Sequence, residues 1–351
     1  MRTPSAKTFL FLTDRMCFGW GVSVVIENLI KHLKNQGIKV RVGCLQHDES
    51  YQALDIFPAQ PNVGEVENVI QTEQVSLVVA FTSPFFEILP ELEMNVRCIA
   101  WEHGDPTPEF FPEGREERLQ VINYKQDRVY KQISAVITGS DFLRWDIGFP
   151  SAYPIYNGCD HVHDLGPKQK QTFASLARPV HIGTLARFGR GESFYKGNSL
   201  FLKLAKRARE NHLPVEFSIM GRGEEGDRQP YLEAGIQVHL NASDEERARY
   251  LRNLDVFISC SQWEGFNLPL VEAQALGTAS LAFDIGSHPE VTPLLCSSLD
   301  DALCLIKKYQ EDRILLSEHS LMCYQFVRKK FVWERTVNHF LSHLRELGIA
   351  T

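Results

Sequence analysis

The chain has 351 residues, of which 44% are hydrophobic and 23% are charged, and its formal net charge is −7. A chain of this length is longer than most domains that have a single hydrophobic core, so we expect two globular domains. The negative charge argues against a binder of duplex nucleic acid, which usually presents a basic face, and we therefore expect no nucleic-acid partner.

The sequence also argues against membrane spans and disulfides. No apolar run reaches the roughly 18 residues that a membrane-spanning helix needs. The first apolar run ends at Asp14 and Arg15 without a small-residue cleavage site, so we interpret it as a buried strand rather than a secretion signal. The eight cysteines include no CxxC pair, which favours reduced core residues over disulfides and predicts a cytoplasmic protein.

Short apolar runs, most of them rich in β-branched residues, alternate along the chain with stretches long enough to form a helix. The first series of candidate strands covers 8–13, 39–45, 75–81, 96–101, 135–139 and 153–156. The second series covers 180–185, 215–220, 237–240, 256–260 and 280–283. Continuous apolar runs are typical of parallel strands that are buried on both faces. We therefore predict an α/β fold with two doubly wound, Rossmann-like parallel-sheet domains.

The domain boundaries follow from one polar stretch that lacks periodicity. We predict an N-terminal Rossmann-like domain at 1–160, a linker at 161–178 and a C-terminal Rossmann-like domain at 179–325. A long helical pattern covers 318–347, and we assign 326–351 to a C-terminal helix that could cross back to the N-terminal domain. Periodicity alone leaves that crossing open.

In doubly wound folds ligands bind outside the carboxyl ends of the strands, so the turns after the strands are where site residues are expected. The turn after the first strand contains Gly19 and Gly21. Glycines let the backbone approach a ligand closely, and the following helix N-terminus favours an anion. A tight turn explains them about as well. The spacing is not GxGxxG and no acid ends the second strand, which disfavours an NAD enzyme.

The turn after the fourth strand contains His103 and Asp105. A histidine there could orient a substrate hydroxyl or relay a proton near neutral pH. A loop histidine that is bonded to backbone is the alternative, and position alone favours neither.

Two histidines in the linker, His161 and His163, raise the question of a metal site. The stretch has no further ligands nearby, and the chain contains no DxD pattern that could hold a divalent ion against a diphosphate. We therefore expect no metal and no bound cofactor.

The second series of strands opens with a turn that carries two cations. Arg187 directly follows a strand and Lys196 precedes a helix, so together they could neutralise a diphosphate. Solvated surface charges are the commoner explanation for any one Arg or Lys, but the position after a strand favours function. The sequence GRG, with Gly221 and Gly223, offers a second turn where a ligand could approach the backbone.

The stretch CSQWEGFNLPLVE places two acids, Glu264 and Glu272, on either side of a strand-to-helix turn, with seven residues between them. Pro269 suits the first helical position, and Asn267 is the one candidate for a side-chain cap. We expect free N–H groups at this helix start, which favour a phosphate. Carboxylates suit hydroxyl pairs, because each ionised oxygen accepts hydrogen bonds. The order of acid, helix start and acid in this stretch matches the order of sugar, diphosphate and ribose in a sugar nucleotide.

These pieces occur in one order along nearly the whole chain: the glycine loop, the histidine, NG-x-D, Arg…Lys-Gly, GRG and EGFNLPLVE. In this order the chain resembles retaining glycosyltransferases of the GT-B fold, most closely glycosyltransferase family 4 with its E-x7-E signature. The resemblance implies two Rossmann-like domains that face a central cleft. It also implies catalysis without a bound metal. The usual GG pair of the first loop is GWG here, which leaves the role of Gly19 open.

The resemblance further assigns roles to single residues. It implies that Glu264 contacts the hydroxyls of the transferred sugar and Glu272 contacts the ribose. His103 matches the histidine on the acceptor side, next to Asp105. The remaining donor contacts are Arg187 and Lys196 on the diphosphate, Gly21 facing a phosphate, the GRG glycines Gly221 and Gly223, and the backbone of Gly265, Phe266, Asn267 and Leu268.

We therefore predict a retaining, metal-independent glycosyltransferase that moves a sugar from a nucleotide-diphosphate sugar to a hydroxyl acceptor. The acceptor class stays open between a glycan, a lipid-linked molecule and a small molecule, with glycan, lipopolysaccharide or exopolysaccharide assembly as the setting. Peripheral contact with the inner face of the cell membrane is open as well. The alternatives are a nucleotide-sugar epimerase on the same fold and a non-catalytic sugar-nucleotide-binding or scaffold protein.

Overall fold

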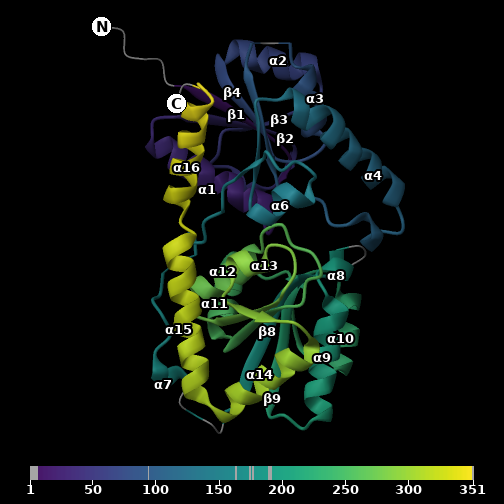
Figure 1. The fold of residues 1–351 in the computed structure, drawn as a ribbon, viewed down its shortest axis with the longest axis vertical. Coiled ribbons are helices and arrows are strands. Elements are labelled where there is room, and N and C mark those ends of the chain that lie inside the picture. The colour runs from purple at the N-terminus through teal and green to yellow at the C-terminus, as the bar shows by residue number, and fades with distance from the viewer. Residues whose placement is uncertain are drawn as a thin grey trace. The chain divides into compact units, whose positions relative to one another are not determined.

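The computed structural model describes residues 7–349 except 94, 163, 174, 176, 177 and 189–191. The chain divides into two compact units (Figure 1). Unit 1 comprises Met1–Pro108, Glu113–Gly158 and Trp333–Thr351, and unit 2 comprises Glu109–Pro112 and Cys159–Val332. No helix in the described part of the chain is long and apolar enough to cross a membrane.

Unit 1 is built on a seven-stranded sheet in the order β3-β2-β1-β4-β5-β6-β7, and all of its described pairings are parallel. Its strands are β1 (Thr8–Met16), β2 (Lys39–His47), β3 (Ile56–Pro58), β4 (Val75–Ala80), β5 (Arg97–Glu102), β6 (Ala135–Thr138) and β7 (Tyr153–Pro154). The central strand β1 carries four consecutive side chains without exposed area, Phe9 to Leu12. Consecutive residues point to opposite faces of a strand, so both faces of this sheet are covered.

Unit 1 also contains several helices and one returning segment. They are α1 (Gly21–Asn35), α2 (Val63–Thr72), α3 (Phe85–Ile88), α4 (Arg115–Tyr124), α5 (Tyr130–Gln132), α6 (Asp141–Asp146) and α16 (Trp333–Glu346), with a π-helical turn η4 (Lys125–Val129) between α4 and α5. All of these α-helices except α4 bury side chains. The C-terminal helix α16 packs beside α1 (Figure 1). Its Phe340 ring lies 6.5 Å from the Phe9 ring and 5.2 Å from the Trp101 ring, so the last segment completes the first core.

Unit 2 is built on a six-stranded sheet in the order β10-β9-β8-β11-β12-β13, again with parallel pairings throughout its described strands. The strands are β8 (Val180–Arg187), β9 (Val215–Arg222), β10 (Gln237–Leu240), β11 (Val256–Ser259), β12 (Ala279–Phe283) and β13 (Leu294–Cys296). In each sheet the winding reverses beside the first strand, between β1 and β4 and between β8 and β11. The carboxyl ends of strands at such reversals form the ligand crevice of doubly wound folds.

The helices of unit 2 lie on both faces of its sheet. They are α7 (Lys170–Phe173), α8 (Glu192–Tyr195), α9 (Asn198–Glu210), α10 (Gln229–Glu233), α11 (Asp244–Asn253), α12 (Leu268–Ala275), α13 (His288–Val291), α14 (Leu299–Glu311) and α15 (Arg313–Lys330). Helix α15 packs on α12 and β12, whereas α14 packs on α9 and β8 (Figure 1).

The structure confirms the predicted fold class of two doubly wound parallel sheets, and it adds details that the pattern missed. Strands β3 and β13 were not predicted, and each has only three residues. The long C-terminal pattern is two helices, because the chain leaves the helical conformation at Phe331, where ψ is 83°. There the Phe331 carbonyl accepts the N–H of Cys159 at 3.1 Å, so a tertiary contact ends the helix. The eight cysteines are free in the structure, and six of them are buried.

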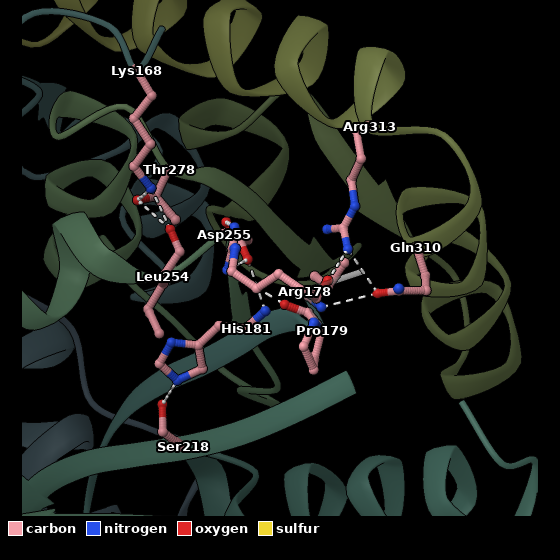
Figure 2. Close-up of polar contacts among 11 residues, drawn as sticks. Lys168, Arg178, Pro179, His181, Ser218, Leu254, Asp255, Thr278, Gln310 and Arg313 are labelled. Carbon is pink, nitrogen blue, oxygen red and sulfur yellow. Dashed lines mark hydrogen bonds and ion pairs between the residues drawn. The ribbon is translucent and has the colours of Figure 1, made fainter. Parts of the chain in front are cut away.

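Polar contacts attach the segment before β8 to unit 2 (Figure 2). Lys168 is 8% exposed, and its Nζ donates to the carbonyl of Leu254 and to Thr278 Oγ1. Arg178 donates one hydrogen bond of 2.8 Å to each carboxylate oxygen of Asp255. Burial disfavours the charged amine and outweighs the attraction of Asp255, which lowers the pKa of Lys168 to about 7.

We predict that Lys168 weakens the fold at neutral pH and that this cost falls as the pH rises. The pKa of its amine is about 7 in the fold against a reference value of 10.5. Between these values the unfolded chain binds the proton that the folded chain lacks, so stability rises with pH. The free energy of unfolding of the wild type minus that of Lys168→Met should grow by roughly 1 kcal/mol between about pH 8 and 9. Urea unfolding measures it, and a pH-independent difference would contradict the prediction.

Candidate active site

The carboxyl ends of β8 and β11 bring together the predicted cations and one predicted acid. Arg187 is the last residue of β8, and its Nη1 lies 3.0 Å from a carboxylate oxygen of Glu192. Lys196 follows α8, and its Nζ donates to both carboxylate oxygens of Glu264, at 2.9 and 3.1 Å. Burial opposes a charge on Lys196, but the attraction of Glu264 prevails and raises the pKa of the amine to about 12. Lys196 and Glu264 therefore form an ion pair at neutral pH.

Glycine at 197 makes this pair possible. Gly197 has a φ of 69°, and a Cβ there would lie 1.8 Å from the carbonyl oxygen of Cys260. The turn after β8 therefore passes directly against the end of β11. On the other side of the acid, a Cβ at Gly286 would lie 2.6 Å from the backbone oxygen of Glu264. Glycines in two turns thus lie directly against the backbone of Cys260 and of Glu264.

The second acid, Glu272, lies on α12 and is completely buried. Its Oε1 lies 2.9 Å from His161 Nε2, and its Oε2 lies 3.1 Å from Arg247 Nη1. Burial alone would raise the pKa of this carboxyl, but Arg247 and His161 lower it to about 2. The stability that ionised Glu272 contributes is therefore complete above its reference pKa of 4.5 and is lost as the pH falls toward about 2.

The turn between the two acids differs in detail from the expectation. Asn267 is the N-cap, and its side-chain oxygen accepts the N–H of Leu270 at 3.2 Å, so the expectation of a free N–H is wrong at that position. Leu268 is the first residue of α12, which places Pro269 second rather than first. The Phe266 ring is half-buried and packs edge-on against Phe331, with ring centroids 5.5 Å apart. Backbone contacts of Gly265, Phe266, Asn267 and Leu268 to a donor stay a prediction.

The GRG glycines have a packing role that the sequence could not show. A Cβ at Gly221 would lie 2.0 Å from the carbonyl oxygen of Ala186, and one at Gly223 would lie 2.5 Å from Phe188 Cβ. The close approach of β9 to the end of β8 is by itself a reason for glycine at both positions. Their contact with a donor stays a prediction.

A buried polar network around Glu264 contains residues that the sequence analysis missed. Ser261 Oγ donates to Glu264 Oε1 at 2.7 Å, and Asn267 Nδ2 lies 3.0 Å from His288 Nε2. Ser259 Oγ accepts from Asn267 Nδ2 at 2.9 Å. His288 follows strand β12, so the rule of inspecting every turn after a strand would have found it.

In unit 1 the predicted histidine occupies the loop after β5. His103 Nε2 is buried and has no hydrogen-bond partner in the described part of the chain. Burial lowers the pKa of His103 to about 4, so the ring is neutral at physiological pH. The ring stacks near Phe81, with centroids 6.2 Å apart. A buried ring nitrogen without a partner is the kind of atom that a ligand hydroxyl would satisfy.

The other predicted residue of this loop, Asp105, is held by a lysine that the sequence analysis missed. Lys125 is 2% exposed, and its Nζ bonds both Asp105 Oδ2 and Glu102 Oε1. Tyr130 OH donates to the same Glu102 oxygen at 2.6 Å, and Glu102 Oε2 accepts the N–H of Gly104 at 3.3 Å. The buried cluster therefore holds the backbone on both sides of His103.

The π-helical turn η4 explains how Lys125 and Tyr130 reach one oxygen. Residues five apart in an α-helix point roughly 140° away from each other. In η4 the N–H of Tyr130 bonds the carbonyl of Lys125, which is the five-residue spacing of a π-helix. This spacing brings both side chains to the same side of the helix. Helical periodicity in the sequence does not reveal such a turn.

The predicted glycine loop of unit 1 precedes α1. Gly19 has a φ of 71°, a conformation that L side chains rarely adopt, so the turn itself requires glycine. Gly21 is the first residue of α1, and the N-cap residue Trp20 forms no side-chain capping bond. The start of α1 is therefore compatible with the expected anion, although the turn also explains Gly19.

Unit 2 contains a hollow of 1130 Å³ that runs along β10, from Gln237 at its start to the residues just after β9 and β10. Its lining includes Gly223, Asn241 and Glu246 but neither Lys196 nor Glu264. Glu246 precedes Arg247 on α11, so the hollow adjoins α11, whose Arg247 pairs with Glu272 on α12. Among the described residues no group of three or more His, Cys, Asp or Glu side chains is arranged to hold a metal ion. His163, the second histidine of the considered metal pair, lies outside the described residues.

Residues 180–307 match the family model described as glycosyl transferases group 1. An uncharacterised glycosyltransferase of Methanocaldococcus jannaschii is 21% identical over 225 residues, which are 60% of this chain and 53% of that protein. The chain thus spans about half the length of this relative.

Two solved structures resemble this chain over almost its whole length. Anabaena HepE, in complex with UDP and glucose, has a TM-score of 0.76 at 16% identity, and the match covers 97% of this chain and 100% of that chain. Sucrose-phosphate synthase from Thermosynechococcus elongatus also has a TM-score of 0.76, at 15% identity, with 98% and 100% covered. These likenesses confirm the predicted GT-B fold.

We predict that the Lys125 cluster stabilises unit 1 strongly. Lys125→Met leaves Glu102 and Asp105 without their buried cation and should lower the free energy of unfolding by about 3–5 kcal/mol. Tyr130→Phe removes one hydrogen bond to a charged oxygen and should cost about 1.5–3 kcal/mol. Urea unfolding measures both variants.

A matched control for this prediction lies nearby. Lys131 pairs with Asp127 on the surface, where the two side chains are 60% and 72% exposed. Lys131→Met should change stability by less than about 1 kcal/mol, because exposed ion pairs contribute little. Equal effects of the Lys125 and Lys131 variants would show that the buried cluster is not stabilising.

Proposed function

We propose that the chain is a retaining glycosyltransferase that uses a nucleotide-diphosphate sugar as donor and a hydroxyl group as acceptor. The observation that carries this proposal is the Lys196–Glu264 ion pair beside Arg187, at the carboxyl ends of β8 and β11. The match of residues 180–307 to glycosyl transferases group 1 supports it.

The pairing of an acid with a cation fits the chemistry of a donor sugar. In a sugar nucleotide the sugar hydroxyls lie a few bonds from the diphosphate, so the groups that bind them must be neighbours. Lys196 and Arg187 would neutralise the diphosphate, and Glu264 would accept hydrogen bonds from the sugar. The same cations would stabilise the negative charge that develops on the leaving nucleoside diphosphate, which is usually the largest contribution to catalysis.

We assign Glu272 to the ribose of the donor. Its carboxylate is ionised, and its Oε2 has no well-aligned hydrogen bond in the described part of the chain. The adjoining hollow of 1130 Å³ offers room for the rest of the nucleoside. His161 and Arg247 keep this acid charged inside the protein, so a ribose would meet an acceptor that is already oriented.

Retention and metal independence are part of the proposal and rest on the resemblance. No acid can be named as a covalent nucleophile, so we propose front-face attack, in which the departing phosphate accepts the proton of the acceptor. Arg187 and Lys196 supply the positive charge that a divalent ion would otherwise bring.

For the acceptor we propose a hydroxyl group of a glycan, a lipid-linked molecule or a small molecule, bound on the His103 side. The ring of His103 is neutral, and its buried Nε2 has no partner among the residues that the structure describes, so it is suited to accept a hydrogen bond from such a hydroxyl. Asp105 is engaged by Lys125, so its role would be to hold the loop. Because Anabaena HepE binds UDP and glucose, UDP-glucose is the first donor to test.

Loss of Glu264 or Arg187 should abolish most of the transfer. We predict that Glu264→Ala and Arg187→Ala each lower kcat/KM by roughly 100-fold or more, the order of effect seen when one electrostatic stabiliser is removed. Arg207→Ala is the control, because Arg207 lies on α9 in an exposed pair with Asp300. The assay is sugar transfer to a panel of acceptors, with circular dichroism as a check on folding. Full activity of either folded site variant would overturn the proposal.

The two acids should differ in what their loss impairs. Glu264→Gln should mainly lower the transfer rate, whereas Glu272→Gln should mainly weaken the binding of the nucleoside diphosphate. Calorimetry with a panel of nucleoside diphosphates, together with initial rates, separates the two effects. If Glu264→Gln weakened nucleoside diphosphate binding as much as Glu272→Gln, the division of roles would be wrong.

A further inference from the structure

One buried histidine, to which the resemblance assigns no role, belongs to the hydrogen-bond network around Glu264. His288 begins α13, and its side chain has no exposed area. Its Nδ1 lies 2.8 Å from the carbonyl oxygen of Phe283, and its Nε2 lies 3.0 Å from Asn267 Nδ2. Ser259 Oγ lies 3.3 Å from the same Nε2. Both ring nitrogens of His288 therefore have hydrogen-bond partners within the protein.

These partners determine which nitrogen carries the proton. A carbonyl oxygen only accepts hydrogen bonds, so Nδ1 of His288 must donate to Phe283. Burial lowers the pKa of His288, although Glu264 and Asp284 favour its charge, so the ring is neutral. In a neutral ring only one nitrogen is protonated, and Nε2 must then accept.

An accepting Nε2 fixes the orientation of the Asn267 amide. The nitrogen of that amide must face His288, and its oxygen then faces the N–H of Leu270 at 3.2 Å. The same Nδ2 lies 3.3 Å from Glu264 Oε1 and donates to Ser259 Oγ. A flipped amide would place two donors against each other at α12 and two acceptors against each other at His288. One amide hydrogen faces His288 Nε2, and the other is shared between Ser259 Oγ and the more distant Glu264 Oε1. The ring of His288 therefore keeps the donor side of the amide, rather than its oxygen, next to Glu264.

The consequence for Glu264 is an asymmetry between its two oxygens. Oε1 receives donors from Ser261, Lys196 and Asn267, at 2.7, 2.9 and 3.3 Å. In the described part of the chain, Oε2 receives only Lys196, at 3.1 Å. Since a carboxylate oxygen accepts about two hydrogen bonds, Oε1 is saturated by the protein. Oε2 is the oxygen left for a ligand.

We infer that His288 is a positioning residue for the donor sugar, which acts through the Asn267 amide to hold Glu264 Oε1 and leave Oε2 for a sugar hydroxyl. This inference rests on the proposed function and adds to it the residues that orient the sugar-binding acid. His288 touches no part of the sugar in this arrangement.

Two variants of His288 test the inference. His288→Leu removes both ring nitrogens, whereas His288→Gln keeps an acceptor that can reach Asn267 Nδ2. Calorimetry compares the binding of UDP, GDP, ADP and dTDP with the binding of their glucose or mannose derivatives. Transfer rates are then measured with the sugar nucleotide that the wild type uses. His288→Leu should lower kcat by roughly 10-fold or more, the order expected when a hydrogen bond to a charged group is lost. The wild type should bind the sugar nucleotide more tightly than the nucleoside diphosphate alone, and His288→Leu should remove this difference. His288→Gln should restore most of the lost kcat and most of the lost difference in affinity.

The matched control is His319, a partly buried histidine of α15 in unit 2. Its Nδ1 lies 2.7 Å from the hydroxyl oxygen of Tyr309. His319→Leu should also cost stability but keep the added affinity for the sugar, because His319 does not line the hollow proposed for the nucleoside. His288→Leu should bind the nucleoside diphosphate with an affinity within about 3-fold of that of the wild type. Such retained binding would show that the substitution affects the positioning of the sugar and does not damage the whole site.

The outcomes separate the inference from the proposed function. If folded His288→Leu keeps the wild-type kcat and the added affinity for the sugar, the inference is wrong and the proposed function stands. If the wild type binds none of the sugar nucleotides, both fail. Long-range nitrogen NMR of the His288 ring in the free protein gives a further test, because a proton on Nε2 rather than Nδ1 would overturn the inference whatever the activity.

Discussion

A carboxylate that is withdrawn from water needs a cation and hydrogen-bond donors beside it, and this constraint organises the functional parts of both units. Glu102, Glu264 and Glu272 are each at most 4% exposed. Each has its own cation, which is Lys125, Lys196 or Arg247. Because each pair joins segments that are distant in sequence, satisfying the acids also fixes the loops that carry them.

The constraint explains features that look unrelated along the chain. The π-helical turn after α4 lets Lys125 and Tyr130 share one oxygen of Glu102. A glycine next to Lys196 lets the turn after β8 pass against the end of β11. Both are local departures from regular structure, and both place a donor on a buried acid. Strain or irregularity of this kind is commonly found where a protein places functional groups.

The sequence predicted what depends on local pattern. Apolar runs identified eleven of the strands, because a strand buried on both faces reads as a continuous hydrophobic segment. Arg187, Lys196 and Glu264 were found because they follow strands, and the topology then brings strand ends together. Strands β3 and β13 escaped because each has three residues of which one is exposed, so neither is a continuous buried run, whereas the two-residue β7 lies within the longer apolar run 153–156.

The sequence could not predict the partners of the acids. Glu102 and Lys125 are 23 residues apart, and His161 and Glu272 are 111 apart, so no periodicity links them. His161 was considered with His163 as a possible metal ligand and judged not to be one, but its actual partner, Glu272, could not be predicted. The packing of Gly221 and Gly223 against the end of β8 likewise appears only when the strands are placed side by side. Such pairings are properties of the folded topology rather than of any segment.

The Lys196–Glu264 pair also bears on selectivity for the donor. An anion that binds Lys196 alone competes with Glu264 for the amine, and in doing so it leaves the buried carboxylate with one donor fewer. A ligand that carries both a phosphate and a nearby hydroxyl compensates for both losses at once, because the hydroxyl donates to the acid while the phosphate receives the amine. Free phosphate or an unattached sugar satisfies only half of the pair. The arrangement therefore favours a molecule in which the two groups are covalently joined, and the proposed sugar-nucleotide donor is such a molecule.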